Sequence, residues 1–127
     1  MIRNISLLLF AAAGVTLAAD LAAFKEEMVK IEDAKLDLEE AIDRKDAVLV
    51  TKAAAKMIPL LVSSERFWIA AKLPVAAGKA HENLETAKAV AAAANTGKIG
   101  EAGAALKKLS AQCTACHETH YEAKLPK

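Results

Sequence analysis

The chain has 127 residues, the size of one domain, and a formal net charge of +1 from 17 Lys and Arg and 16 Asp and Glu. This near-neutral balance gives no indication of nucleic-acid binding or of attraction to an acidic membrane surface. A hydrophobic content of 54 % excludes a disordered chain, while 4 % aromatic residues and abundant alanine favour helices over sheets.

Residues 1–19 have the layout of a cleaved secretory signal. Arg3 supplies a short positive region, residues 5–17 form an apolar run, and two alanines follow. The run stops at Asp20 and is shorter than the roughly 20 apolar residues that a spanning helix needs, so a retained membrane anchor is the less favoured alternative.

We expect cleavage after Ala18 or Ala19. The domain is then 20–127, with no stable membrane insertion. An exported protein lies outside the cytoplasm, which in a bacterium means the periplasm.

The first helical segment is expected from Asp20, a plausible N-cap, to about Arg44. Its apolar residues recur with heptad spacing, and Lys35 alone interrupts the stripe. The stripe consists of Leu21, Phe24, Met28, Ile31, Leu38 and Ile42.

Asp46 is the expected cap of a second helical segment, whose apolar stripe runs from Val50 to Ala71. Pro59 lies inside this segment. A proline within a helix removes one backbone hydrogen bond and clashes with the preceding turn. The sequence therefore predicts a kink at Pro59 or a helix broken in two.

Two further helical segments follow. Pro74 suits the first turn of the third, and 95–97, Asn-Thr-Gly, forms a stop and a turn. The fourth begins at Ile99 and frays toward Pro126. Its inward stripe is expected at Ile99, Ala102, Leu106, Leu109, Cys113, Cys116 and His120. Four amphipathic helices with short connections predict an all-α, up-down-up-down antiparallel four-helix bundle.

The only two cysteines, Cys113 and Cys116, stand with His117 in a C-x-x-C-H run, the spacing of c-type haem attachment. On a helix, residues three and four apart share a face, so the three side chains point the same way. Two thiols can then bond to the two vinyl groups of haem, and the adjacent imidazole can bind the iron as an axial ligand.

Three alternatives account for less of the pattern. A disulfide between Cys113 and Cys116 leaves His117 unexplained. A thioredoxin-like redox pair requires a βαβ setting, which an all-helical chain lacks. A zinc site needs a further ligand, such as His120 or His81, and exported cysteines seldom serve that purpose.

With a signal peptide, four helices and one C-x-x-C-H in the last helix, the chain resembles the class II c-type cytochromes. These are the cytochrome c′ proteins and their six-coordinate, low-spin relatives. The resemblance implies one covalent haem c inside one end of the bundle. It also implies electron transfer or, where one iron position is open, binding of small gases. The basic residue that often follows the family motif and pairs with a haem propionate is absent, and Lys124 is a possible substitute.

Met28 is the expected second axial ligand of the iron. In an antiparallel bundle, His117 and Met28 lie about 9 and 12 Å from the same end, and a thioether is a soft ligand that suits low-spin haem. The alternative is that Met28 only fills the core. Met57 is too deep and is expected in the core, while His81 sits on the edge of its stripe. His120 shares a helix with His117, so it cannot reach the opposite face of the iron.

Phe24, Phe67 and Trp68 are expected near the haem end, where they either wall the cofactor or pack as ordinary core. We expect a periplasmic monohaem cytochrome that exchanges electrons with redox partner proteins and is not an enzyme. The alternative is a five-coordinate protein that binds NO or CO. A haem-free interaction module is a third class, and the sequence leaves open whether the bundle forms a homodimer.

Overall fold

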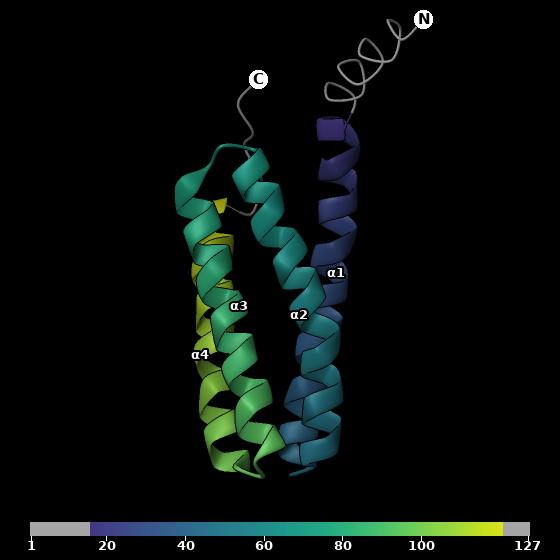
Figure 1. Ribbon diagram of the computed structural model, residues 1–127, viewed down its shortest axis with the longest axis vertical. Coiled ribbons are helices and arrows are strands. Elements are labelled where there is room, and N and C mark those ends of the chain that lie inside the picture. The colour runs from purple at the N-terminus through teal and green to yellow at the C-terminus, as the bar shows by residue number, and fades with distance from the viewer. Residues whose placement is uncertain (1–15, 121–127) are drawn as a thin grey trace, which may run out of the picture.

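Four antiparallel α-helices joined by short turns make up the part of the chain that the computed structural model describes, residues 16–120 (Figure 1). They are α1 (Thr16–Asp43), α2 (Ala47–Ala70), α3 (Pro74–Asn95) and α4 (Ile99–His120). The described residues contain no strand, so the predicted all-α four-helix bundle is confirmed. Most of the expected signal segment and the expected fraying toward Pro126 lie outside the described residues.

The turns between helices follow the chemistry of their residues. Asp46 caps α2 as predicted, because its carboxylate accepts hydrogen bonds from the backbone N–H groups of Val48 and Leu49, both at 3.1 Å. Pro74 occupies the first turn of α3. Gly97 has a φ of 72° and reverses the chain after α3, as expected of a glycine beyond a helix end.

One expectation about helix ends is wrong. Asp20 is not an N-cap, since α1 begins at Thr16 and runs through it; the intervening Leu and Ala are strong helix formers that extend the helix. The alternative of a break at Pro59 is not realised, because α2 is continuous. Pro59 and Ala55 are both exposed, so water can bond the carbonyl that the proline leaves unpaired. The upper half of α2 leans away from α1 toward α3 (Figure 1).

The larger of two core clusters fills the middle and lower bundle. Its most completely buried side chains are Leu38, Val50, Met57, Val90 and Leu109. Each helix contributes at least one of them, so the predicted stripes do meet in one core. The expectation that Met57 is a core residue is thereby confirmed.

A smaller aromatic cluster lies at the other end, where α1 begins and α2 ends. The rings of Phe24 and Phe67 stack with centroids 4.1 Å apart, and Trp68 meets each of them edge-on at 5.1 Å. Ala76 and Ala80 of α3 are buried against these rings. The three aromatic residues therefore close the end of the bundle where α4 finishes.

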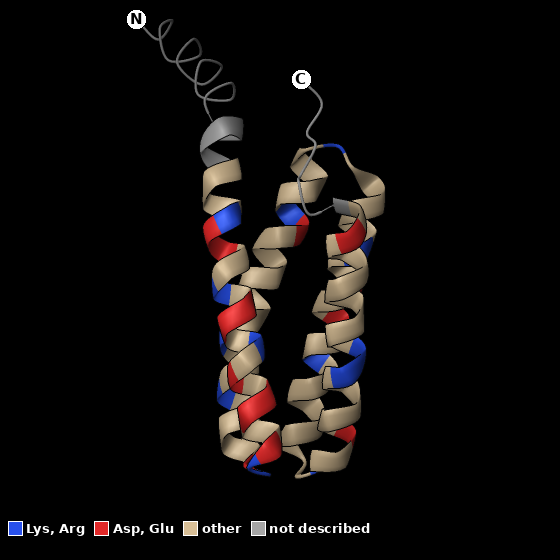
Figure 2. Cartoon of the chain, turned by 180° about the vertical axis from the view of Figure 1, so that it is seen from behind, with Lys and Arg blue, Asp and Glu red and all other residues tan. Residues whose placement is uncertain are grey.

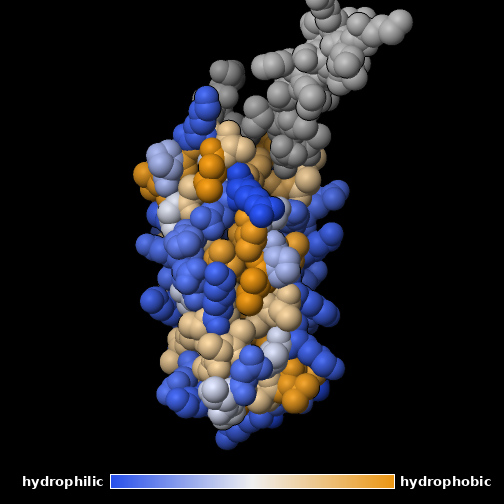
Figure 3. Space-filling model, in the orientation of Figure 1, coloured by the Kyte–Doolittle hydropathy of each residue, from blue (hydrophilic) through white to orange (hydrophobic). Residues whose placement is uncertain are grey.

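Charged and polar side chains cover most of the face shown in Figure 3. A few large apolar residues are more than half exposed, namely Val29, Leu36, Val48, Ile69 and Val75. Within residues 16–120, α2 is the one helix long and apolar enough to cross a membrane by length and composition. Eight of its residues are buried in the bundle. Apolar residues on α2 therefore contribute to the core of the bundle.

The four helices do not contact each other equally. Helix α2 packs most closely on α3, while α1 and α4 touch each other far less than the other neighbouring pairs. Figure 2 shows α1 and α4 side by side, with acidic residues along α1. We call the line along which these two helices face each other the α1–α4 seam.

Candidate cofactor-attachment site

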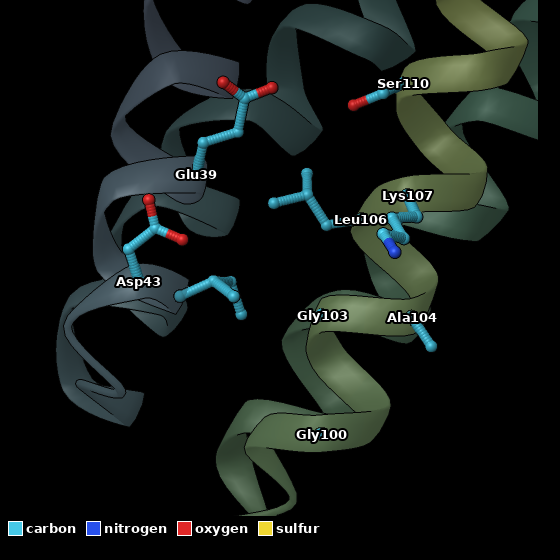
Figure 4. Close-up of a pocket in the computed structure, with 9 residues that line it drawn as sticks. Glu39, Asp43, Gly100, Gly103, Ala104, Leu106, Lys107 and Ser110 are labelled. Atoms are coloured by element: carbon cyan, nitrogen blue, oxygen red, sulfur yellow. The ribbon is translucent and has the colours of Figure 1, made fainter.

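One side of α1 and one side of α4 form the α1–α4 seam. At its lower end Glu39, Ile42 and Asp43 of α1 line a shallow groove with Gly103 and Ser110 of α4 (Figure 4). Gly103 lies beside Ile42, since a Cβ added at Gly103 would lie 3.4 Å from Ile42 Cγ2. This contact fixes which residues of the two helices stand opposite each other.

Residues seven apart lie on nearly the same side of an α-helix. His117 lies one heptad after Ser110 and two after Gly103, so all three face α1. By the same spacing, Met28 and Lys35 share the α4-facing side of α1 with Ile42. The seam therefore consists of Met28, Lys35 and Ile42 on α1 and of Gly103, Ser110 and His117 on α4.

The antiparallel register then places Met28 at the level of His117. From the contact between Ile42 and Gly103, two heptads lead back along α1 to Met28 and forward along α4 to His117. Both steps cover about 21 Å at 1.5 Å per residue. The sequence had predicted this common level from helix lengths alone, and the contact supports it independently.

Cys113 lies between the core and the seam. It is half-buried and packs against the larger core cluster, and its sulfur is a free thiol. Burial raises the pKa of the Cys113 thiol, while the charge of Lys35 lowers it and that of Glu32 raises it further. Because both charged groups belong to α1, Cys113 is under the electrostatic influence of the seam.

Cys116 lies one turn later and toward the other neighbour of α4. It is also a half-buried free thiol. Burial raises the pKa of the Cys116 thiol, and the charge of Lys79 on α3 opposes this rise. His117 is exposed. The three predicted residues thus occupy one stretch of α4, with Cys113 at the core, Cys116 toward α3 and His117 toward α1.

Met28, the other predicted iron ligand, and the remaining residues considered around the expected haem are placed differently. Met28 is half-buried and packs against both core clusters. His81 is 56 % exposed, and its Nδ1 lies 3.1 Å from Glu65 Oε1 across α2 and α3, so it does not join the cysteines. The side chain of His120 and the whole of Lys124 lie outside the described part of the structure.

Sequence reasoning did not identify the charged neighbours of the thiols. In the sequence, Lys35 stands out only as an interruption of the apolar stripe. The expected site includes neither Glu32 nor Lys79. Residue spacing along one helix cannot show which residues of other helices lie nearby. The interruption at Lys35 was the one available signal.

The residues present fit a covalently attached haem better than a zinc ion. The two half-exposed thiols are three residues apart, an imidazole follows, and the adjoining seam is the least packed of the bundle. Among the described residues, no group of three or more His, Cys, Asp and Glu could hold a metal ion.

No family model, curated protein or solved structure matches the chain. A function must therefore be argued from the chemistry and geometry of the residues themselves.

Proposed function

We propose that the chain is an exported class II c-type cytochrome that carries electrons between redox partner proteins in the periplasm. Haem c would be attached to Cys113 and Cys116, with His117 as an axial ligand. One observation supports this most directly. The two free thiols and the imidazole lie together on α4, the helix that packs least against its neighbour α1.

Attachment needs only the two thiols. Each sulfur adds across one vinyl group and forms a C–S bond, and the proton of the thiol goes to the other vinyl carbon. No oxidant or reductant is consumed. Burial raises the pKa of both thiols and so favours the neutral thiol over the thiolate.

When bound, haem supplies a one-electron Fe(III)/Fe(II) couple. His117 of α4 and Met28 of α1 would hold the iron. A thioether ligand favours the reduced iron and raises the reduction potential. Phe24, Phe67 and Trp68 close this end of the bundle against α3, while His117 on α4 is exposed.

A second candidate function is binding of NO or CO by a five-coordinate haem. The packing of Met28 against both core clusters favours it. If this side chain stays in the core, the iron position facing α1 remains open. Met28 is therefore the residue that separates the two functions.

Visible spectra of the purified protein test both candidates, after expression together with haem-attachment machinery. If Met28 is the second axial ligand, as the electron-transfer function proposes, the spectra should be low-spin in both redox states and CO should bind slowly or not at all. High-spin spectra and rapid CO binding would favour the gas-binding function. Absence of haem absorbance would overturn both and favour a haem-free interaction module.

A further inference from the structure

Lys35 lies where an apolar residue is expected. It stands on the inward stripe of α1 between Ile31 and Leu38, both buried, and its side chain is only 18 % exposed. The other described lysines of α1, Lys25 and Lys30, are exposed. A lysine on an inward stripe is uncommon, because its charged end must still reach water or a partner of opposite charge.

Glu32 compensates part of the charge. Its Oε1 lies 3.3 Å from Lys35 Nζ, but the carboxylate side chain is 50 % exposed and therefore well solvated. Most of the Lys35 side chain is therefore enclosed in the bundle, and the charges of Lys35 and Glu32 act on Cys113 in opposite directions.

The register places Lys35 close to the proposed haem. It is opposite Ser110 and one heptad from both Met28 and His117, which is about 10 Å along the helix axes. Cys113 lies between these two levels on α4. A charge at this depth is screened by solvent much less than one on the surface.

We propose that Lys35 raises the reduction potential of the haem through its charge. This inference rests on the proposed function. Reduction adds one negative charge to the iron site, so a nearby enclosed cation favours the Fe(II) state. Glu32 opposes this effect, and the pair sets the potential without touching the iron.

Equilibrium redox titration of the holoprotein tests the inference. Lys35→Met keeps the length of the side chain and removes the charge, and it should lower the midpoint potential. At a separation of about 10 Å, the ratio of reduced to oxidised protein at a fixed ambient potential should fall about three- to tenfold. Lys30→Met, an exposed change on the same helix, should leave the potential unchanged.

Two further variants separate charge from packing. Lys35→Arg keeps the charge and should retain the wild-type potential, whereas Glu32→Gln removes the opposing charge and should raise it. An unchanged potential in Lys35→Met, or equal decreases in Lys35→Met and Lys35→Arg, would overturn the inference. If Lys35→Met does not fold, Glu32→Gln alone decides, and an unchanged potential there contradicts the inference.

The visible spectrum distinguishes this failure from failure of the proposed function. The inference about Lys35 is contradicted only when the wild type and the variants carry haem to the same extent and the potential does not change as predicted. The proposed function is contradicted when the wild type carries no covalent haem.

Discussion

The α2–α3 seam and the α1–α4 seam are built in opposite ways. Between α2 and α3, buried residues such as Met57, Leu61, Leu84 and Val90 belong to one continuous core. Along the α1–α4 seam, close contact at Gly103 gives way to the charge of Lys35 and then to the exposed His117. The helices thus gain most of their packing from three seams, while the fourth is less closely packed and carries charged and polar residues. A cofactor bound there could make contacts with α1 and α4 that the two helices do not make with each other.

The two methionines of the described chain give the largest expected difference between these regions. Met57 is 1 % exposed in the core, whereas Met28 is half-buried at the α1–α4 seam. Met57→Ala should lower the free energy of unfolding by about 2–5 kcal/mol, and Met28→Ala should lower it less. Denaturant unfolding of both haem-free variants measures this.

In the spectrum of the holoprotein, the substitution of Met28 should have the larger effect and the substitution of Met57 the smaller one. Met28→Ala should convert a low-spin haem to high spin, allow CO to bind readily and lower the reduction potential. Met57→Ala, checked for folding first, serves as the control and should retain the wild-type spectrum. A low-spin spectrum that survives Met28→Ala would show that another residue binds the iron.

The pH dependence of the thiols sharpens the comparison at Cys113. Burial in the folded chain raises its pKa, so the unfolded chain loses the thiol proton first as pH rises. The stability that the neutral thiol contributes is complete below the ordinary thiol pKa of about 8.5. It is lost as pH rises from there through the raised folded pKa.

Alkylation of the haem-free protein by iodoacetamide provides the measurement. The pH at half-maximal rate for Cys113 should be higher in native buffer than in urea, and Cys116→Ala isolates this signal. Equal midpoints in the two solvents would mean that Cys113 is not buried against the core.

The smallest effects are expected at the lower end of the α1–α4 seam, where α4 begins. Gly100 has open space around it, so Gly100→Ala should stabilise the protein by about 0.5–1 kcal/mol through helix propensity. Gly103→Ala should stabilise it at least as much, because the new methyl would add a van der Waals contact with Ile42 Cγ2 at 3.4 Å. Thermal unfolding of the two variants compares them. A smaller gain at Gly103 than at Gly100 would show that α1 and α4 lie closer together there than the structure describes.

The sequence predicted the fold more completely than the surroundings of the site. Asp46, Pro74 and Gly97 act through local backbone chemistry, so their effects on helix ends could be predicted from single positions. The start of α1 could not, because a capping residue competes with the helix propensity of the residues before it. Pro59 showed the same competition, since a long helix can pass an exposed proline.

The candidate site divides in the same way. The spacing of Cys113, Cys116 and His117 is a property of one helix and was visible in the sequence. The proximity of Lys35 and Lys79 to the thiols depends on the rotation and register of three helices. Those quantities follow from contacts such as that between Gly103 and Ile42, which no local pattern reveals.

The central claim is that Cys113 and Cys116 hold one haem covalently at the end of the α1–α4 seam. Mass spectrometry of protein that has been denatured and extracted with acidified organic solvent tests it most directly. The wild type, expressed with haem-attachment machinery, should keep the mass of the polypeptide plus one haem. The double variant Cys113→Ala/Cys116→Ala should have the mass of the polypeptide alone. A wild type of polypeptide mass, or a double variant that retains haem, would contradict the claim.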